Sequence, residues 1–451
     1  MLKSIFLLLF ISNNFLTAET LMECVNTVIK TNPNIQKYYN IYKVARGDIS
    51  VAQSAYYPKL NLSLGHGSEE SDQYNRAGST DISGLDLDVS EYLLAYTHNI
   101  FDGFATTHRV VGEKARTKSA AYAYLEQANT KTFEMVDAYL QQLKYSELLT
   151  NAKENITINK KILTRVEKLF KSGLTTYSEV NKVLASHSLS QSNYILHENN
   201  LLNAQYNLEE ILGNVVDVKT MKKPHLAVKI PNTYEEALSF ALKNNPSIRA
   251  NEFTIKFAQE KWKEKRAKYY PELDIEVSQS INENLSAIQG NDDRFRMMLV
   301  LKYNFFNGFA DSSEIEKSVH KVNEETFSQS NNKRKISKDL RLSFASYTKL
   351  TQQTEHIKQY KAFTYKTLTL YSKEYDLGKR SLLDLLSVQN DFIAAKAQMI
   401  NVDYSLLLAK YRILNAMGTM VSSTLGTDKK IHSKVQLLST NSIKTGNTDV
   451  Y

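Results

Sequence analysis

Two stretches of 41 residues in this chain resemble each other, and this repeat decides the fold. Residues 20–60 read TLMECVNTVIKTNPNIQKYYNIYKVARGDISVAQSAYYPKL, and residues 233–273 read TYEEALSFALKNNPSIRANEFTIKFAQEKWKEKRAKYYPEL. The two align without a gap at an offset of 213, and they share Thr-x-x-Glu, Asn-Pro-x-Ile and Tyr-Tyr-Pro-x-Leu at matching places. Such a repeat predicts a protein built from two copies of one structural unit.

A second gapless alignment, at an offset of 205, covers the remainder of each copy. It matches Phe101-Asp102-Gly103-Phe104-Ala105 with Phe306-Asn307-Gly308-Phe309-Ala310, then Gly173 with Gly378 and Gly213 with Gly418. The sequence therefore predicts a first repeat at residues 19–213, a linker at 214–232 and a second repeat at 233–420. The copies differ by eight residues, and all eight fall between Leu60 and Phe101.

The two ends of the chain differ from the repeats. Lys3 precedes an apolar stretch at residues 5–16, and Thr17-Ala18 supplies small residues before Glu19, which predicts a signal peptide at 1–18. A membrane anchor is the alternative, but the apolar stretch is too short for a helix that spans ~30 Å. Residues 421–451 are polar and rich in Ser, Thr, Lys and Asn, so we expect a disordered tail.

Each copy is expected to begin with two short helices. Thr20 and Thr233 precede a Glu by three residues, the pattern of a capped helix start. Pro33 and Pro246 then predict a break before the second helix, which should end near the Tyr-Tyr-Pro segment.

Very long helices are expected later in each copy. There are 60 residues without Gly or Pro between Gly112 and Gly173, and 69 between Gly308 and Gly378. A helix of that length would reach ~90 Å. Gly173 and Gly378 then predict turns, after which a second helix returns to form an antiparallel hairpin.

Strands are expected between the short and the long helices. After Pro58 and after Pro271, apolar residues alternate with polar ones, and this period of two predicts a strand. Polar loops at 65–84 and 279–293 should lead to returning strands at 91–101 and 294–306. Strands of ~10 residues can cross a bilayer when tilted. A soluble antiparallel sheet with one wet face is the alternative.

Alternation also assigns the two faces of these strands. We expect Leu299 to face lipid and Lys302 to face a lumen. One face of the last strand holds Phe295, Met297, Leu299, Leu301, Tyr303 and Phe305, and the other holds Arg296, Met298, Val300, Lys302 and Asn304.

Four strands are too few to close a barrel. A membrane strand leaves no free edge, and the smallest outer-membrane barrels have eight strands. The chain is therefore expected to oligomerise, with eight strands and a filled interior from two copies, or twelve strands and a lumen from three.

No enzyme chemistry is indicated. The nine histidines show no helical i, i+3 or i+4 pairing, Cys24 is the one cysteine, and no phosphate-binding loop or dinucleotide fingerprint occurs. Basic residues are interspersed with acids despite the net charge of +8, which disfavours nucleic-acid binding. We expect no catalytic residue, no metal and no cofactor.

The chain resembles the TolC family of outer-membrane channel proteins over residues 19 to about 420. The resemblance rests on the order of the segments above, together with Gly173-Leu174-x-x-x-Ser178-Glu179-Val180 and Tyr375-x-x-Gly378-x-Arg380-x-x-x-Asp384. It implies a mixed fold, in which long antiparallel α-helical hairpins form a tunnel (an α-barrel) across the periplasm and four transmembrane β-strands per chain join a twelve-stranded β-barrel in a homotrimer.

The same resemblance implies a passive exit duct in the outer membrane. The duct would export drugs, other small molecules or proteins in a tripartite efflux or type I secretion machine. Its partners would be a periplasmic adaptor (membrane fusion) protein and an inner-membrane transporter of ABC, RND or MFS type. A pore-less periplasmic coiled-coil scaffold or surface adhesin is the alternative, which explains the helices but not the paired strands.

The resemblance also implies a gate at the periplasmic mouth. Tyr375 and Arg380 match positions that link to partners matching Ser178 and Glu179, and Asp384 matches a cation-selective entrance ring. Ser387 departs from the family's second acidic ring, so a weaker cation site is expected. An acid at a helix start also suits the helix dipole, which is the alternative role for Glu179 and Asp384.

Overall fold

The computed structural model describes residues 20–73, 82–215, 220–224 and 230–425. Within them the duplication is visible as helices of identical length. The pairs are α1 (Leu21–Thr31) and α5 (Tyr234–Asn244), α2 (Pro33–Gln53) and α6 (Pro246–Arg266), α3 (Ala105–Lys171) and α7 (Ala310–Asp376), and α4 (Tyr177–Leu212) and α8 (Leu382–Met417). Both α3 and α7 have 67 residues, which corresponds to ~100 Å of helix. The predicted signal peptide lies outside the described residues.

Contacts divide the chain into two compact units. The helical unit comprises the described parts of residues 1–39, 122–249 and 331–451, and the sheet unit comprises those of 40–121 and 250–330. The helices α2, α3, α6 and α7 each contribute residues to both units.

The duplicated Asn-Pro segments connect helices within the helical unit. The side-chain amide of Asn32 donates to the carbonyl of Ile211 near the end of α4 (3.2 Å), and its Oδ1 accepts from the N–H of Asn34 (3.0 Å). The second copy repeats this arrangement, because Asn245 donates to the carbonyl of Ala416 (3.0 Å) and accepts from Ser247 N–H (2.9 Å). Each asparagine therefore joins the end of one helix to the start of another.

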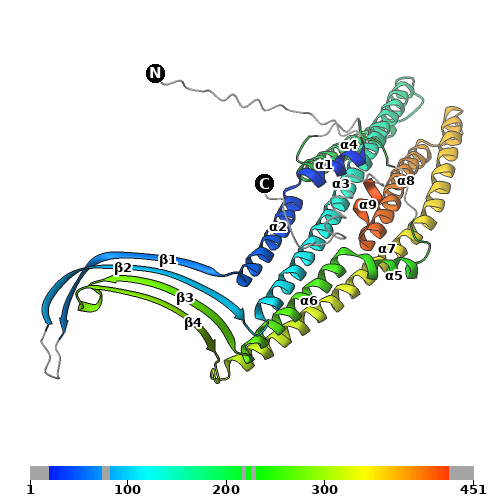
Figure 1. Cartoon of the computed structure of the whole chain (residues 1–451). Helices are drawn as coiled ribbons and strands as arrows, with labels where there is room; N and C mark the ends of the chain where they lie inside the picture. The colour runs from blue at the N-terminus through cyan, green and yellow to red at the C-terminus, as the bar shows by residue number, and fades with distance from the viewer. Residues whose placement is uncertain (1–19, 74–81, 216–219, 225–229, 426–451) are drawn as a thin grey trace, which may run out of the picture. The chain divides into compact units, whose positions relative to one another are not determined.

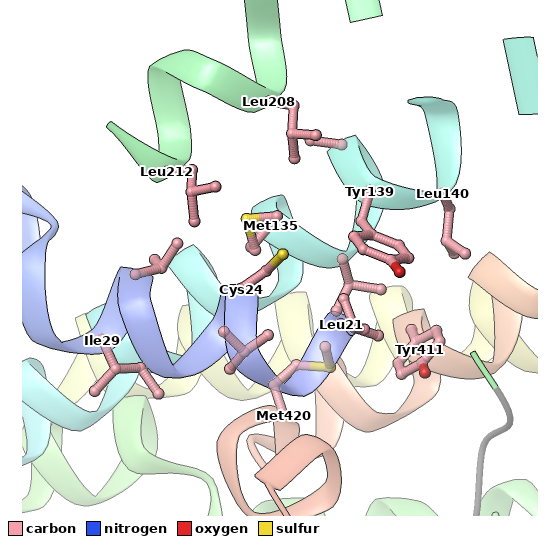
Figure 2. Close-up of a cluster of buried hydrophobic side chains, with 14 of the residues drawn as sticks. Leu21, Cys24, Ile29, Met135, Tyr139, Leu140, Leu208, Leu212, Tyr411 and Met420 are labelled. Carbon is pink, nitrogen blue, oxygen red and sulfur yellow. The ribbon is translucent and has the colours of Figure 1, made fainter. Parts of the chain in front are cut away.

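The main apolar core of the helical unit gathers α1, α3, α4, α8 and α9 (Met420–Leu425) (Figure 2). Cys24 is fully buried there, beside Val25 and Val28. The helix α9 corrects the expected start of the disordered tail, because Met420, Val421 and Leu425 are buried in this core. Residues 421–425 are thus helical, and the remainder of the predicted tail lies outside the described residues.

The sheet unit carries one four-stranded antiparallel sheet, in the order β1-β2-β3-β4 (Figure 1). Its strands are β1 (Lys59–Gln73), β2 (Ile82–Phe101), β3 (Glu272–Glu283) and β4 (Asn291–Lys302). The expected loops at 65–84 and 279–293 were placed wrongly, since strand pairing runs well into both ranges. A short 3-10 helix, η4 (Leu285–Ala287), lies between β3 and β4. Backbone pairing continues there although the polar side chains no longer alternate with apolar ones.

The strand β4 ends at Lys302, earlier than the expected end at residue 306. The physical reason is that β4 is an edge strand in the single chain. In the first repeat, residues 98–101 of β2 are the equivalents of residues 303–306, and they pair with Leu273, Asp274 and Ile275 of β3. Residues 303–306 have no strand beside them in the described chain.

The register confirms the predicted separation of faces. Leu60 lies opposite Tyr96, and Ile275 lies opposite Leu299, so all four strands place apolar side chains on one face. That face stays exposed along its length, with exposed fractions of 64–70% for the side chains on the edge strands: Leu60, Leu62, Leu64, Phe295, Met297, Leu299 and Leu301. Among the described helices, none is both long enough and apolar enough to span a membrane.

Candidate functional site

The candidate site lies where each long helix reverses direction. Gly173 (φ +72°) follows α3 and Gly378 (φ +69°) follows α7, a left-handed conformation that glycine adopts without steric cost. Thr176 and Ser381 occupy the N-cap positions of α4 and α8, and the Ser381 side chain accepts from the N–H of Asp384. All five predicted gate and ring residues lie within a few residues of these turns.

The tips of the two hairpins pack against each other. Val166, Val180 and Val183 of the first hairpin form a buried apolar cluster with Leu382 and Leu386 of the second. Tyr375 packs against the same cluster. The fold therefore brings together gate residues that are about two hundred positions apart in the sequence.

Tyr375 is influenced by one cation and one anion from the first hairpin. The Arg165 guanidinium lies 5.2 Å from its ring centroid and also pairs with Asp376. Burial raises the pKa of Tyr375, the charge of Glu179 raises it further, and Arg165 opposes both. The phenol therefore keeps its proton and remains a hydrogen-bond donor at neutral pH.

Arg380 is held by its own hairpin. Its Nε donates to Glu374 Oε2 at 2.8 Å, and its Nη2 lies 2.7 Å from the same oxygen. The guanidinium also lies 4.1 Å from the ring centroid of Tyr371 and 4.0 Å from Asp384. These contacts fix the direction of the charged group at the turn.

Glu179 and Asp384 occupy equivalent places, each in the first turn of its helix. Asp384 accepts from the hydroxyl of Ser381 (2.8 Å), while its own N–H donates to that hydroxyl (3.2 Å). Glu179 accepts from the hydroxyl of Thr175. Both carboxylates thus lie at the positive end of a helix, where the helix dipole stabilises a negative charge. This placement supports the alternative role for Glu179 and Asp384 and leaves a role in a cation site open.

The single chain brings some predicted partners together and not others. Tyr375 is close enough to Glu179, a predicted partner, for its pKa to respond. Arg380 instead approaches Asp384, which was not predicted as its partner. Within the described residues no hydrogen bond joins Tyr375 or Arg380 to Ser178, whose hydroxyl lies 3.0 Å from that of Thr176. The assignment of these residues to a gate stays a prediction.

Sequence reasoning missed four residues at this site: Arg165, Tyr371, Glu374 and Asp376. Glu374 lies six residues before Arg380, a spacing that matches no helical contact. The turn at Gly378 creates the contact by folding the chain back. No signal in the sequence marks the pairing of Arg165 with Asp376, because it joins two hairpins.

A buried polar seam, formed by Asn155, Asn159, Ser186 and Gln389, also joins the hairpins. The Asn155 Oδ1 accepts from Gln389 (3.2 Å) and from Asn159 (3.0 Å), and the Asn159 Oδ1 accepts from Ser186 (3.0 Å). Asn159 and Gln389 are fully buried. The contact between the hairpins is therefore apolar at the tips and hydrogen-bonded along this stretch.

The described parts of the chain contain no group of three or more His, Cys, Asp or Glu side chains that could hold a metal ion. The expectation that the protein uses no metal stays a prediction.

Comparison with known proteins gives consistent matches over both repeats. A family model described as "Outer membrane efflux protein" matches residues 24–214 and 237–419. "Outer membrane efflux protein BepC" of Brucella suis is 19% identical over 91% of this chain and 87% of its own length, and "Outer membrane protein TolC" of Escherichia coli is 21% identical over 89% and 83%. The Campylobacter jejuni CmeC outer membrane channel has the same fold, with a TM-score of 0.78 at 14% identity over 93% of this chain and 89% of its own.

Proposed function

The chain belongs to the outer membrane efflux protein family, whose members are outer-membrane channels that extend into the periplasm, and we propose that three copies form one passive exit duct. The family match confirms the predicted resemblance and the predicted outer-membrane location. The proposal adds the trimer, a closed β-barrel, and a role in a tripartite efflux or type I secretion machine.

The exposed apolar face of the sheet carries this proposal. A soluble protein rarely leaves so many leucine, methionine and phenylalanine side chains more than half exposed on one continuous face. Lipid is the solvent that suits that face. In lipid every backbone N–H and C=O group of a strand must be hydrogen-bonded, so the sheet must close into a barrel without a free edge. Three copies supply twelve strands, which leave an open lumen.

The helical hairpins are evidence for the periplasmic part of the proposed duct. Three copies of α3, α4, α7 and α8 would supply twelve long helices for a periplasmic tunnel. Apolar side chains stay exposed at the hairpin turns, with Leu174 at 75% and Leu377 at 70%. Exposed apolar tips favour docking to another protein. The periplasmic adaptor is the proposed partner at these tips, and an ABC, RND or MFS transporter in the inner membrane would supply the energy.

Ion conductance in planar bilayers tests the proposed duct against a pore-less scaffold or adhesin. We expect purified protein to migrate as a heat-modifiable trimer and to form discrete conducting channels. A scaffold would give the helical content and the trimer without conductance. Absence of channels from correctly assembled trimers would overturn the duct.

The first gate prediction concerns Arg380 and Tyr375. We expect Arg380→Ser combined with Tyr375→Phe to raise single-channel conductance severalfold, because the changes remove the charge held by Glu374 and the hydroxyl of a half-buried tyrosine near Glu179. Lys379→Ser removes the same charge from the exposed neighbouring position and serves as the control. Equal conductance in all three proteins would remove Arg380 and Tyr375 from the gate.

The second gate prediction concerns Asp384. In a trimer its three copies would form an acidic ring at the mouth, and converging carboxylates favour a bound cation. We expect Asp384→Ala to weaken channel block by divalent or trivalent cations added on the periplasmic side. Asp391→Ala removes an exposed acid farther along α8 and should leave the block unchanged. If both variants keep the block, the ring is not formed by Asp384.

A further inference from the structure

The first repeat contains a cavity in the helical unit, lined by α3, α4 and the start of α2 at Pro33. Its volume of about 770 Å³ is within the range that is common for small-ligand sites. About 35 Å of α4 separates Tyr177, where the helix begins, from Asn200, where the cavity begins. The cavity is therefore distinct from the candidate gate at the hairpin turns.

Three asparagines line the α4 wall of this cavity. Asn200, Asn203 and Asn207 follow one another at spacings of three and four, so their side chains lie on the same face of the helix. Among the residues that the structure describes, none of the three side-chain amides has a hydrogen-bond partner. Each amide therefore keeps its N–H donors and its carbonyl acceptor for a ligand.

The charges around the cavity are nearly balanced. Two lysines and three acids belong to its lining: Lys131, Lys144, Glu134, Asp137 and Glu210. Lys131 and Glu134 also neutralise each other in an ion pair of 2.5 Å. Such a lining favours a neutral polar ligand over a strongly charged one.

The second repeat has no corresponding row of asparagines. The equivalent positions on α8, at the offset of 205, are Ser405, Leu408 and Arg412. Leu408 is buried, with 8% of its side chain exposed, and so is Ile336 of α7 (7%), which is the equivalent of Lys131. The same fold therefore accepts apolar side chains at these positions, and its packing does not require the polar cavity of the first repeat.

We propose that this cavity binds a glycan of the cell wall, a chain of N-acetylated amino sugars, and so attaches the duct to the wall. Hydroxyl and acetamido groups are donors and acceptors without charge, which suits the three free amides. Asn200 and Asn207 are about 10 Å apart along α4, the length of a disaccharide. The Tyr145 ring on the α3 wall offers an apolar surface to the C–H groups of a sugar ring.

The place of the cavity on the duct favours a wall glycan over a transported sugar. The short helices α1 and α9 pack on α3, α4 and α8, and inside a tunnel they would fill the lumen. They therefore belong on the outer surface of the tunnel, and the cavity adjoins the junction of α1 and α2 at Asn32. This step rests on the proposed duct, which crosses the periplasm where the cell wall lies.

Co-sedimentation with purified, protein-free peptidoglycan sacculi tests the glycan site. We expect the full chain in detergent to bind saturably, and Asn200→Ala/Asn203→Ala to weaken binding at least about fivefold, because hydrogen bonds to the sugar are lost. Asn193→Ala/Asn199→Ala removes two exposed amides of α4 that do not line the cavity, and should bind like the native protein. Alanine favours a helix more than asparagine does, so both pairs should fold.

Competition identifies the ligand. We expect oligomers of N-acetylglucosamine to release the native protein from sacculi, and free stem peptides to leave it bound. Equal binding by the two paired variants, or release by stem peptides or by salt alone, would overturn the glycan site. Normal binding with loss of trimers in Asn200→Ala/Asn203→Ala would assign these asparagines to a contact between copies instead.

Conductance in planar bilayers separates a failure of the glycan site from a failure of the duct. If the native protein forms channels but does not bind sacculi, the glycan site is wrong and the duct stands. If it binds sacculi through Asn200 and Asn203 but forms no channels, the site stands and the duct is wrong.

Discussion

Leu299→Arg is expected to abolish most trimer assembly in lipid. Leu299 is the ninth of the twelve residues of β4 and lies on the apolar face, with 65% of its side chain exposed. In the proposed barrel this side chain contacts lipid, where an arginine near the bilayer midplane costs about 2–4 kcal/mol in each copy. The measurement is the fraction of heat-resistant trimer after reconstitution into lipid vesicles.

Met298→Arg is the matched control for this change. It introduces the same charge one residue earlier, and therefore on the opposite face of the strand. Met298 lies opposite Glu276, so the new guanidinium would find a carboxylate across the strands. We expect near-normal assembly, with a change only in ion selectivity. Equal loss of trimer in both variants would contradict the assignment of the faces.

Gly103→Ala is expected to destabilise the fold of the single chain strongly. The backbone at Gly103 has φ +66°, which costs a residue with a side chain about 1–2 kcal/mol. The added methyl group also meets the carbonyl oxygen of Ala267 at 2.5 Å. A backbone oxygen cannot turn aside as a flexible side chain can, so overpacking adds about 1–3 kcal/mol.

Gly308→Ala separates these two costs. Its backbone is also left-handed, at φ +56°, but no neighbouring atom lies within 4 Å of the Cβ position in the single chain. We expect a chain that loses only about 1–2 kcal/mol, the cost of the left-handed backbone. It should also yield fewer trimers, because in the proposed barrel the next copy would lie beside this edge of the sheet. Denaturant unfolding of the chain and trimer yield are the two measurements. Equal unfolding of the two variants would show that the contact with Ala267 carries little strain.

Helix ends were predictable because particular residues mark them. Thr20 caps α1 with its side chain while Glu23 reaches back to the Thr20 N–H, and Pro33 begins α2. Gly213 and Gly418 cap the ends of α4 and α8 in the left-handed conformation. Helix caps depend only on residues close together in the chain, so the ends of these helices can be predicted from the sequence alone.

Strand ends and charged pairs at the turns were less predictable, because both depend on what lies beside them. The strand β1 continues to Gln73 since β2 pairs with it, although Gly65 and the residues after it are mostly polar or lack a side chain. Arg380 finds Glu374 only after the chain has turned. The five gate and ring residues were recognisable by resemblance alone, and their roles await the conductance measurements.

The equal lengths of the paired helices bear on how this protein can change during evolution. One residue added to α3 alone would displace the end of that helix by about 1.5 Å and rotate every later side chain by roughly a quarter turn, so it would no longer match α7. Residues added to the β1–β2 hairpin disturb no helix, and the eight-residue difference between the copies falls there. The match between the two copies therefore fixes the length of the helices, whereas the β1–β2 hairpin can lengthen or shorten without disturbing that match.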